Sequence, residues 1–117
     1  MIKTGILGNH AEKLAAKYLK SKGLALVKRN YRCKLGEIDL IMRHQEYLVF
    51  VEVRYRKSNA FGGAAASIGV IKQAKLTKTA QHYMLNHNVA NKPVRFDVIC
   101  LSGDLNRPDY QWITNAF

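Results

Sequence analysis

The run Tyr47–Tyr55 constrains the fold of this chain more than any other segment. It is apolar at nearly every position and rich in valine, which is typical of a strand buried in a sheet. Residues 37–42, just upstream, form a second predicted strand, because acidic and apolar side chains alternate from Glu37 to Leu40. Only residues 43–46 connect the two segments. Because so short a connection joins antiparallel neighbours, we expect residues 37–42 and 47–55 to form a β-hairpin.

The strand period of two places alternate side chains of each segment on opposite faces. In the first segment we assign Ile38, Leu40 and Met42 to one face, and Glu37, Asp39 and Ile41 to the other. In the second segment one face carries Tyr47, Val49, Val51, Val53 and Tyr55, and the other carries Leu48, Phe50, Glu52, Arg54 and Arg56. Asp39 and Glu52 are therefore carboxylates on adjacent predicted strands.

The remaining segments complete an α/β pattern. Asn9 can cap a helix that ends near Gly23, and a longer helical pattern covers residues 68–88. Further strands are predicted at 24–31, 94–101 and 110–114, a turn at 34–36 and a flexible loop at 57–66. We expect a single domain over residues 1–117, in the order αβββαββ, with a mixed central sheet flanked by helices.

The charge of the chain is strongly positive. Nineteen Lys and Arg against eight Asp and Glu give a formal net charge of +11 over 117 residues. No acid occurs between Glu12 and Glu37, or between Glu52 and Asp97, so most bases lack an acidic neighbour in sequence. Such a surface either is a solvated face or binds a polyanion. Because added acids serve solubility better than added bases do, we favour phosphate binding.

Other classes of protein are disfavoured. No stretch approaches about 18 consecutive apolar residues, so we expect neither a transmembrane helix nor a membrane partner. The start of the chain lacks an apolar segment followed by a cleavage site, so we expect no secretory signal. Cys33 and Cys100 form no CxxC motif, which favours free thiols in a reducing cytoplasm.

Glu52 is the residue of the hairpin that most needs an explanation. It lies in the most apolar run of the chain, where a carboxylate is costly unless it is paired or binds a cation. Together, Glu52 and Asp39 can hold Mg²⁺ or Mn²⁺ through oxygen ligands. Such an ion would neutralise phosphate charge and activate a water for attack on phosphorus. Arg54, two positions after Glu52, would stabilise the developing charge.

A purely structural arrangement is the alternative. The two carboxylates would then only form ion pairs with nearby arginines, which perturbs acids without any catalysis. Against this, half of the eight acids fall on or near the one predicted site and its surroundings are strongly basic. These acids are Glu12, Glu37, Asp39 and Glu52.

The segments at 36–41 and 50–56 resemble the YraN-type family of uncharacterised bacterial proteins. The similarity extends to residues 8–15, 29–32, 95–98 and 115–117, so that it covers essentially the whole chain. That family is placed with the restriction-endonuclease-like fold and is similar to archaeal Holliday-junction resolvases. The resemblance therefore implies a nuclease-like domain.

The resemblance also implies a PD-(D/E)xK type of site. Asp39 would be the first metal acid, Glu52 the second, and Glu12 the acid contributed by the N-terminal helix. The backbone carbonyl of Val53 would be a further metal ligand. Arg54 stands where the pattern has Lys, and because Arg cannot lose its proton, it would act electrostatically rather than as a general base.

Three functions remain open at this point. The first is a divalent-metal-dependent endonuclease for branched or structured nucleic acid, DNA rather than RNA, with a homodimer implied by the resolvase-like relatives. The second, motivated by Arg54, is a non-catalytic nucleic-acid-binding module with a degenerate nuclease site. The third is an assembly factor that binds an acidic protein partner. For nucleic acid, the predicted phosphate contacts are Arg32, Arg54, Arg56, Lys72 and Lys75.

Overall fold

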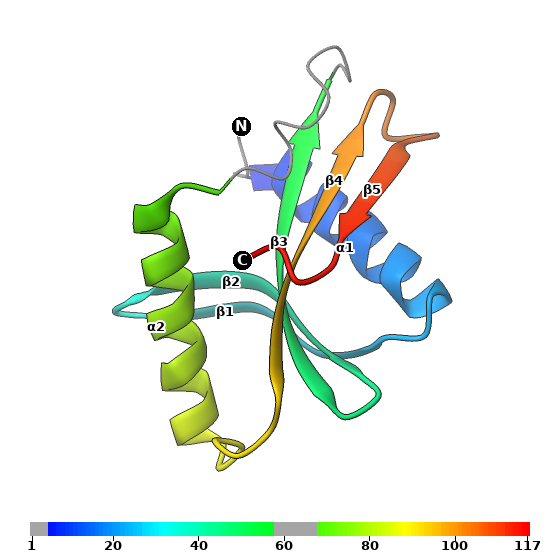
Figure 1. Cartoon of the computed structure of the whole chain (residues 1–117). Helices are drawn as coiled ribbons and strands as arrows, with labels where there is room; N and C mark the ends of the chain where they lie inside the picture. The colour runs from blue at the N-terminus through cyan, green and yellow to red at the C-terminus, as the bar shows by residue number, and fades with distance from the viewer. Residues whose placement is uncertain (1–4, 58–67) are drawn as a thin grey trace.

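The computed structural model describes residues 5–57 and 68–117. They form a five-stranded sheet with one helix packed on each face (Figure 1). The elements are α1 (Gly5–Ser21), β1 (Ala25–Cys33), β2 (Gly36–His44), β3 (Tyr47–Arg56), α2 (Val70–Asn86), β4 (Val94–Ser102) and β5 (Asp109–Ile113). The α/β class and the order αβββαββ are confirmed.

The sheet has the strand order β1-β2-β3-β4-β5 and is mixed, as predicted. Leu40 lies opposite Val51 and His44 opposite Tyr47, which confirms the antiparallel hairpin of β2 and β3. Strands β3 and β4 are parallel, and α2 belongs to the connection between them. A parallel pair needs such a crossover because its strands begin at the same end of the sheet.

Two apolar clusters fill the space between the sheet and the helices. One lies under α1 and includes Val49, Val51 and Val53. The other lies under α2 and includes Leu48 and Phe50. The predicted alternation of β3 is therefore confirmed for these residues, and it leaves Glu52 on the α2 side of the sheet.

The side chains of β2 do not alternate throughout, which corrects the predicted assignment of Ile38. Ile38 packs in the cluster under α2, whereas Leu40 packs in the cluster under α1. The alternation of side chains changes phase at Asp39, and Asn30, which lies between the partners of Ile38 and Leu40 on β1, has a φ of 54°. Asn tolerates this left-handed conformation better than most residues do. The prediction was wrong because the period of two holds only along an uninterrupted strand.

From Asp39 toward the start of β2, the strand no longer pairs with β3. Their ladder ends at Leu40 opposite Val51, whereas the β1–β2 ladder continues to Cys33 opposite Gly36. The separated end of the β1–β2 hairpin packs against α2 (Figure 1). A gap thus opens between two strands that are paired elsewhere, and α2 lies beside it.

The helix boundaries differ from the prediction in one informative respect. Helix α1 begins at Gly5, so Asn9 lies within the helix rather than at its N-cap. Its side chain instead accepts a hydrogen bond from Arg29. Of the predicted loop at 57–66, residues 58–66 lie outside the described residues. Within the described ranges, neither helix is both long enough and apolar enough to cross a membrane.

Candidate functional site: a cleft where β2 and β3 separate

Asp39 and Glu52 are the first residues beyond the last pair of the β2–β3 ladder. Both are buried, with 2% and 3% of their surface exposed, yet both line an open cleft of about 560 Å³. The structure therefore brings the two predicted carboxylates to one cavity. The other lining residues are Gly36, Glu37, Ile71, Lys72, Lys75 and Leu76.

The Asp39 carboxylate is positioned by the backbone of β3. Its Oδ2 accepts a hydrogen bond of 2.8 Å from the backbone N–H of Val53. The β2–β3 ladder has already ended at this level, so a side chain takes the place of a backbone partner for this N–H. A buried N–H left without an acceptor is costly. By accepting from the Val53 N–H, the Asp39 side chain therefore stabilises the arrangement in which the two strands are no longer paired.

The Glu52 carboxylate is paired with an ammonium group from α2. Its Oε2 lies 2.7 Å from Lys72 Nζ. The Glu52 side chain is 3% exposed and that of Lys72 is 45% exposed, so the ion pair joins the buried floor of the cleft to its open rim. This pairing offsets the cost of burying the carboxylate.

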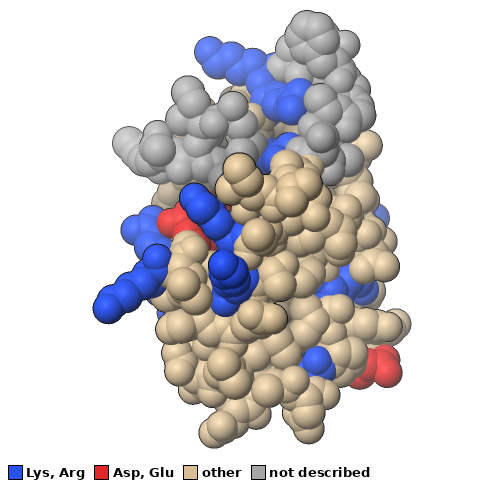
Figure 2. Space-filling view, turned by 60° about the vertical axis from the view of Figure 1, so that its left-hand side comes forward, with Lys and Arg blue, Asp and Glu red and all other residues tan. Residues whose placement is uncertain are grey.

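The mouth of the cleft is cationic. Lys75 lines it beside Lys72, while Arg32 at the end of β1 forms an ion pair with Glu37 at 2.7 Å. Figure 2, which looks toward the α2 side, shows lysine and arginine side chains around an acidic patch. An anion that approaches from this side meets positive charge before it reaches the buried carboxylates.

The structure does not place Glu12 among the residues that line the cleft. Glu12 is buried on α1, and its Oε1 lies 3.7 Å from Arg29 Nη2. Arg54 and Arg56 follow Glu52 along β3, but they also stay outside the lining. Among residues 5–57 and 68–117, no group of three or more His, Cys, Asp or Glu lies close enough to hold a metal ion.

Cys100 lies beside the arginines of β3 but is not suited to nucleophilic chemistry. It is aligned with Arg54 in the parallel ladder of β3 and β4. Burial raises the pKa of the Cys100 thiol, and this effect outweighs the lowering by Arg56 and Arg54. The thiol is therefore protonated at neutral pH, whereas the nucleophile would be the thiolate. Both cysteines are free thiols, as predicted.

Two residues that shape the cleft were not predicted. Ile71 extends its apolar side chain at the rim, 77% exposed, and no sequence pattern distinguished it from a core residue. Gly36 has a φ of 153°, which favours glycine, and a Cβ atom at this position would also lie 2.8 Å from Thr79 Oγ1 of α2. The sequence shows a glycine just before Glu37 and Asp39. Its contact with Thr79 could not be predicted, because Thr79 lies 43 residues away along the chain.

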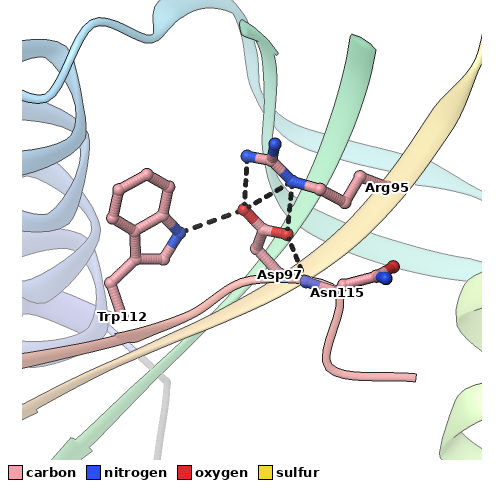
Figure 3. Close-up of polar contacts among 4 residues, drawn as sticks. All are labelled: Arg95, Asp97, Trp112 and Asn115. Atoms are coloured by element: carbon pink, nitrogen blue, oxygen red, sulfur yellow. Dashed lines mark hydrogen bonds and ion pairs between the residues drawn. The ribbon is translucent and has the colours of Figure 1, made fainter.

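A third buried carboxylate, Asp97, lies on β4 and has a different environment (Figure 3). Arg95 donates to both of its oxygens, with its shortest bonds at 2.9 Å. Trp112 Nε1 and the backbone N–H of Asn115 donate at 3.0 Å each. The next residue, Ala116, donates its N–H to the carbonyl of Phe96. Asp97 thus ties β5 and the residues after it to the sheet.

Comparison with known proteins adds a family to this geometry. The model of the uncharacterised protein family UPF0102 matches residues 11–101. A UPF0102 protein of Legionella pneumophila is 53% identical over 111 residues, which cover 94% of this chain and 92% of the relative. Another, from Nitrosomonas europaea, is 49% identical over 117 residues, covering 100% and 98% of the two chains. A third, from Aeromonas hydrophila, is 54% identical over 112 residues, covering 94% and 83%.

Proposed function

The chain belongs to the uncharacterised protein family UPF0102, the YraN family that its sequence resembles, and we propose that it is a divalent-metal-dependent endonuclease. One observation carries the proposal. Asp39 and Glu52 are buried carboxylates from adjacent strands, and they meet in a single open cleft with a cationic mouth. Buried acids are costly, so a cleft that collects two of them beside lysines favours a role with cations and phosphates.

The residues at the base of the cleft fit a divalent ion. Glu52 already binds a cation there, the ammonium of Lys72, whose half-exposed side chain can move out toward solvent. Asp39 and Glu52 would hold the ion, and the carbonyl of Val53 would add a third oxygen. In a strand, the N–H and C=O of one residue point toward the same edge, and the Val53 N–H points toward Asp39. Such an ion supplies neutralisation of phosphate charge and a more acidic bound water.

The substrate class follows from the charge of the cleft and of the chain. Lys72 and Lys75 at the cleft would receive a phosphodiester, and Arg32, Arg54 and Arg56 would hold more distant phosphates. The net charge of +11 favours a polyanion as partner. DNA, in branched or structured form, is the substrate that the resolvase-like resemblance implies.

Lys72 has a second part in this proposal. Arg54 keeps its proton, so it would only stabilise charge on the phosphate. Lys72 supplies the amine that β3 lacks, because it reaches the same carboxylate from α2. If Glu52 held a divalent ion, the ammonium of Lys72 would be free to pair with a phosphate oxygen instead. Glu12 lies outside the lining of the cleft. In this proposal it holds Arg29 in place and does not touch the metal ion.

The decisive experiment measures cleavage. Purified protein is incubated with a four-way junction, a flap, linear duplex DNA and duplex RNA, each with Mg²⁺, Mn²⁺ or EDTA. We expect metal-dependent cleavage that Glu52→Gln and Asp39→Asn abolish. Glu46→Gln, at an exposed position in the β2–β3 turn, is the matched control and should cleave like the wild type. Cleavage that persists in Glu52→Gln would contradict the proposal.

A non-catalytic nucleic-acid-binding module is the second candidate, and the arginine at position 54 favours it. In that case the wild type binds DNA with a steep dependence on salt, but it cleaves no substrate with either metal. Binding by Asp39→Asn would then equal that of the wild type. An absence of salt-dependent DNA binding would exclude both candidates and favour an acidic protein partner.

A further inference from the structure

A second basic groove lies on the opposite side of the sheet from the cleft. Lys13, Lys17 and Lys20 occur at positions i, i+4 and i+7 of α1, so they share one face of the helix, and all three are exposed. With Ala16, Leu26 and Arg29 they line a groove of about 430 Å³. Helix α1 packs on the sheet face under which Val49 and Val51 are buried, whereas the cleft lies on the α2 face.

The acid nearest to this groove in sequence is neutralised within the protein. Glu12 is 5% exposed and faces Arg29, whose Nη2 also donates a 2.7 Å hydrogen bond to Asn9 Oδ1. Arg29 is thereby held at a defined position in the wall of the groove. None of the ion pairs of the described residues involves the three lysines of α1. Their charges are therefore available to a ligand.

The spacing of these charges fits a nucleic-acid backbone. Lys13 and Lys20 are about 10 Å apart along the helix axis. Duplex DNA presents about six phosphate charges over that length, so it offers each of the three lysines a phosphate. An anionic membrane is disfavoured because this face of α1 lacks the Trp and Phe anchors of interfacial helices.

We propose that the α1 groove is a second phosphate-binding surface, which holds one nucleic-acid segment while the cleft holds another. This inference rests on the nucleic-acid binding of the proposed function, although not on cleavage. Helices α1 and α2 lie on opposite faces of one sheet (Figure 1), so two arms of a branched molecule would occupy the two surfaces at once. A single linear arm that lies in the cleft leaves the α1 groove empty.

The test compares two charge-matched triple variants. In one, Lys13, Lys17 and Lys20 are changed to Gln. In the other, Lys34, Lys78 and Lys92 are changed to Gln, all exposed and outside both linings. Binding to a fluorescent four-way junction and to a linear duplex of equal length is measured by anisotropy in EDTA across a salt series. A Lys→Arg version of the α1 triple variant serves as the rescue.

We expect the α1 variant to lose at least about tenfold in affinity for the junction, with a salt slope lower by about 3 because three phosphate contacts are lost. Its affinity for the linear duplex should fall less, the control variant should keep the wild-type slope, and the arginine version should restore binding. Equal losses in both variants would overturn the inference, as would wild-type binding of the junction by the α1 variant. Competition by polyglutamate as strong as that by an oligonucleotide of equal charge would also overturn it.

The outcomes separate this inference from the proposed function. If Glu52→Gln abolishes cleavage but the α1 variant behaves like its control, the cleft is the only surface engaged and the inference fails alone. If the wild type binds the junction through α1 but never cleaves it, the inference stands and the endonuclease proposal fails.

Discussion

Two regions of this molecule contain buried carboxylates beside a basic side chain, and they lead to opposite expectations. Asp97 is enclosed by donors of its own chain, Arg95, Trp112 and the backbone of Asn115 (Figure 3), and it does not line the cleft. Asp39 and Glu52 line an open cleft, and the ammonium on Glu52 comes from a half-exposed lysine. Burial of a carboxylate alone therefore does not identify a functional site. What distinguishes the two regions is whether the basic side chain beside the acid is exposed enough to move away and leave its place to another cation.

The largest effect is expected at Asp97, on stability. Asp97→Ala leaves the guanidinium of Arg95, whose side chain is only 14% exposed, without its carboxylate. We expect a loss of about 3–5 kcal/mol in the free energy of unfolding, since removal of one partner leaves an uncompensated buried charge. Urea unfolding followed by tryptophan fluorescence measures it, because Trp112 is itself a donor to Asp97. Asp109→Ala, at an exposed position of β5, is the control. A loss below about 1 kcal/mol would mean that the two acidic regions do not differ as argued.

Glu52 should show the reverse pattern. Glu52→Gln keeps the shape of the side chain but removes its charge. We expect cleavage to fall by more than about 100-fold, because even outer-shell partners of a metal contribute 10–100-fold. The free energy of unfolding should change little or rise, since a buried charge is removed while Lys72 stays solvated at the rim. Cleavage and urea unfolding are measured on the same preparations. A variant that unfolds as easily as Asp97→Ala would make Glu52 a structural acid.

The hairpin and its acids could be predicted because they depend on neighbours in sequence. The alternation over Tyr47–Tyr55 and the short connection before it determined which strands pair, and hence that Asp39 and Glu52 share a cleft. The face of Ile38 could not be predicted, because the break at Asp39 is accompanied by a left-handed Asn30 on the neighbouring strand.

Contacts between segments that are distant in the sequence also could not be predicted. Residues 95–98 belong to the family resemblance, but the contacts of Asp97 could not be predicted, since two of its donors, Trp112 and Asn115, follow it by 15 and 18 residues. They reach it only once β5 pairs with β4. Lys72 was predicted from charge as a phosphate contact, but its contact with Glu52 depends on how α2 lies over the sheet. That position in turn depends on the close approach at Gly36.

A substitution of Gly36 tests whether the shape of the cleft depends on the close approach of α2 to β2. The Asp97 region, by contrast, depends on polar contacts. In Gly36→Ala the new Cβ would meet Thr79 Oγ1 at 2.8 Å, within a fully buried part of α2. We expect a loss of about 1–3 kcal/mol in the free energy of unfolding, from overpacking and from the strain of an L residue at a φ of 153°. Adding Thr79→Ala should recover part of it in a double-mutant cycle, because it removes the clashing oxygen. If the two losses simply add, the approach of α2 does not explain the glycine.

The smallest effect concerns the exchangeable cation itself. Lys72→Met removes the ammonium that would compete with the proposed divalent ion for Glu52, so we expect Mn²⁺ to bind about tenfold more tightly, equivalent to about 1.4 kcal/mol. The increase in melting temperature on adding Mn²⁺ should therefore be larger than for the wild type, since a ligand stabilises in proportion to the logarithm of its concentration over Kd. Cleavage should nevertheless fall, because the variant has no ammonium at position 72 to pair with the phosphate. Lys75→Met is the matched control: Lys75 lines the same cleft but forms none of the ion pairs of the described residues.

If Mn²⁺ bound Lys72→Met more weakly than both the wild type and this control, the ammonium would support the carboxylate rather than compete for it. The pair of Glu52 and Lys72 would then be as fixed as that of Asp97 and Arg95, and the proposed distinction between the two regions would be lost.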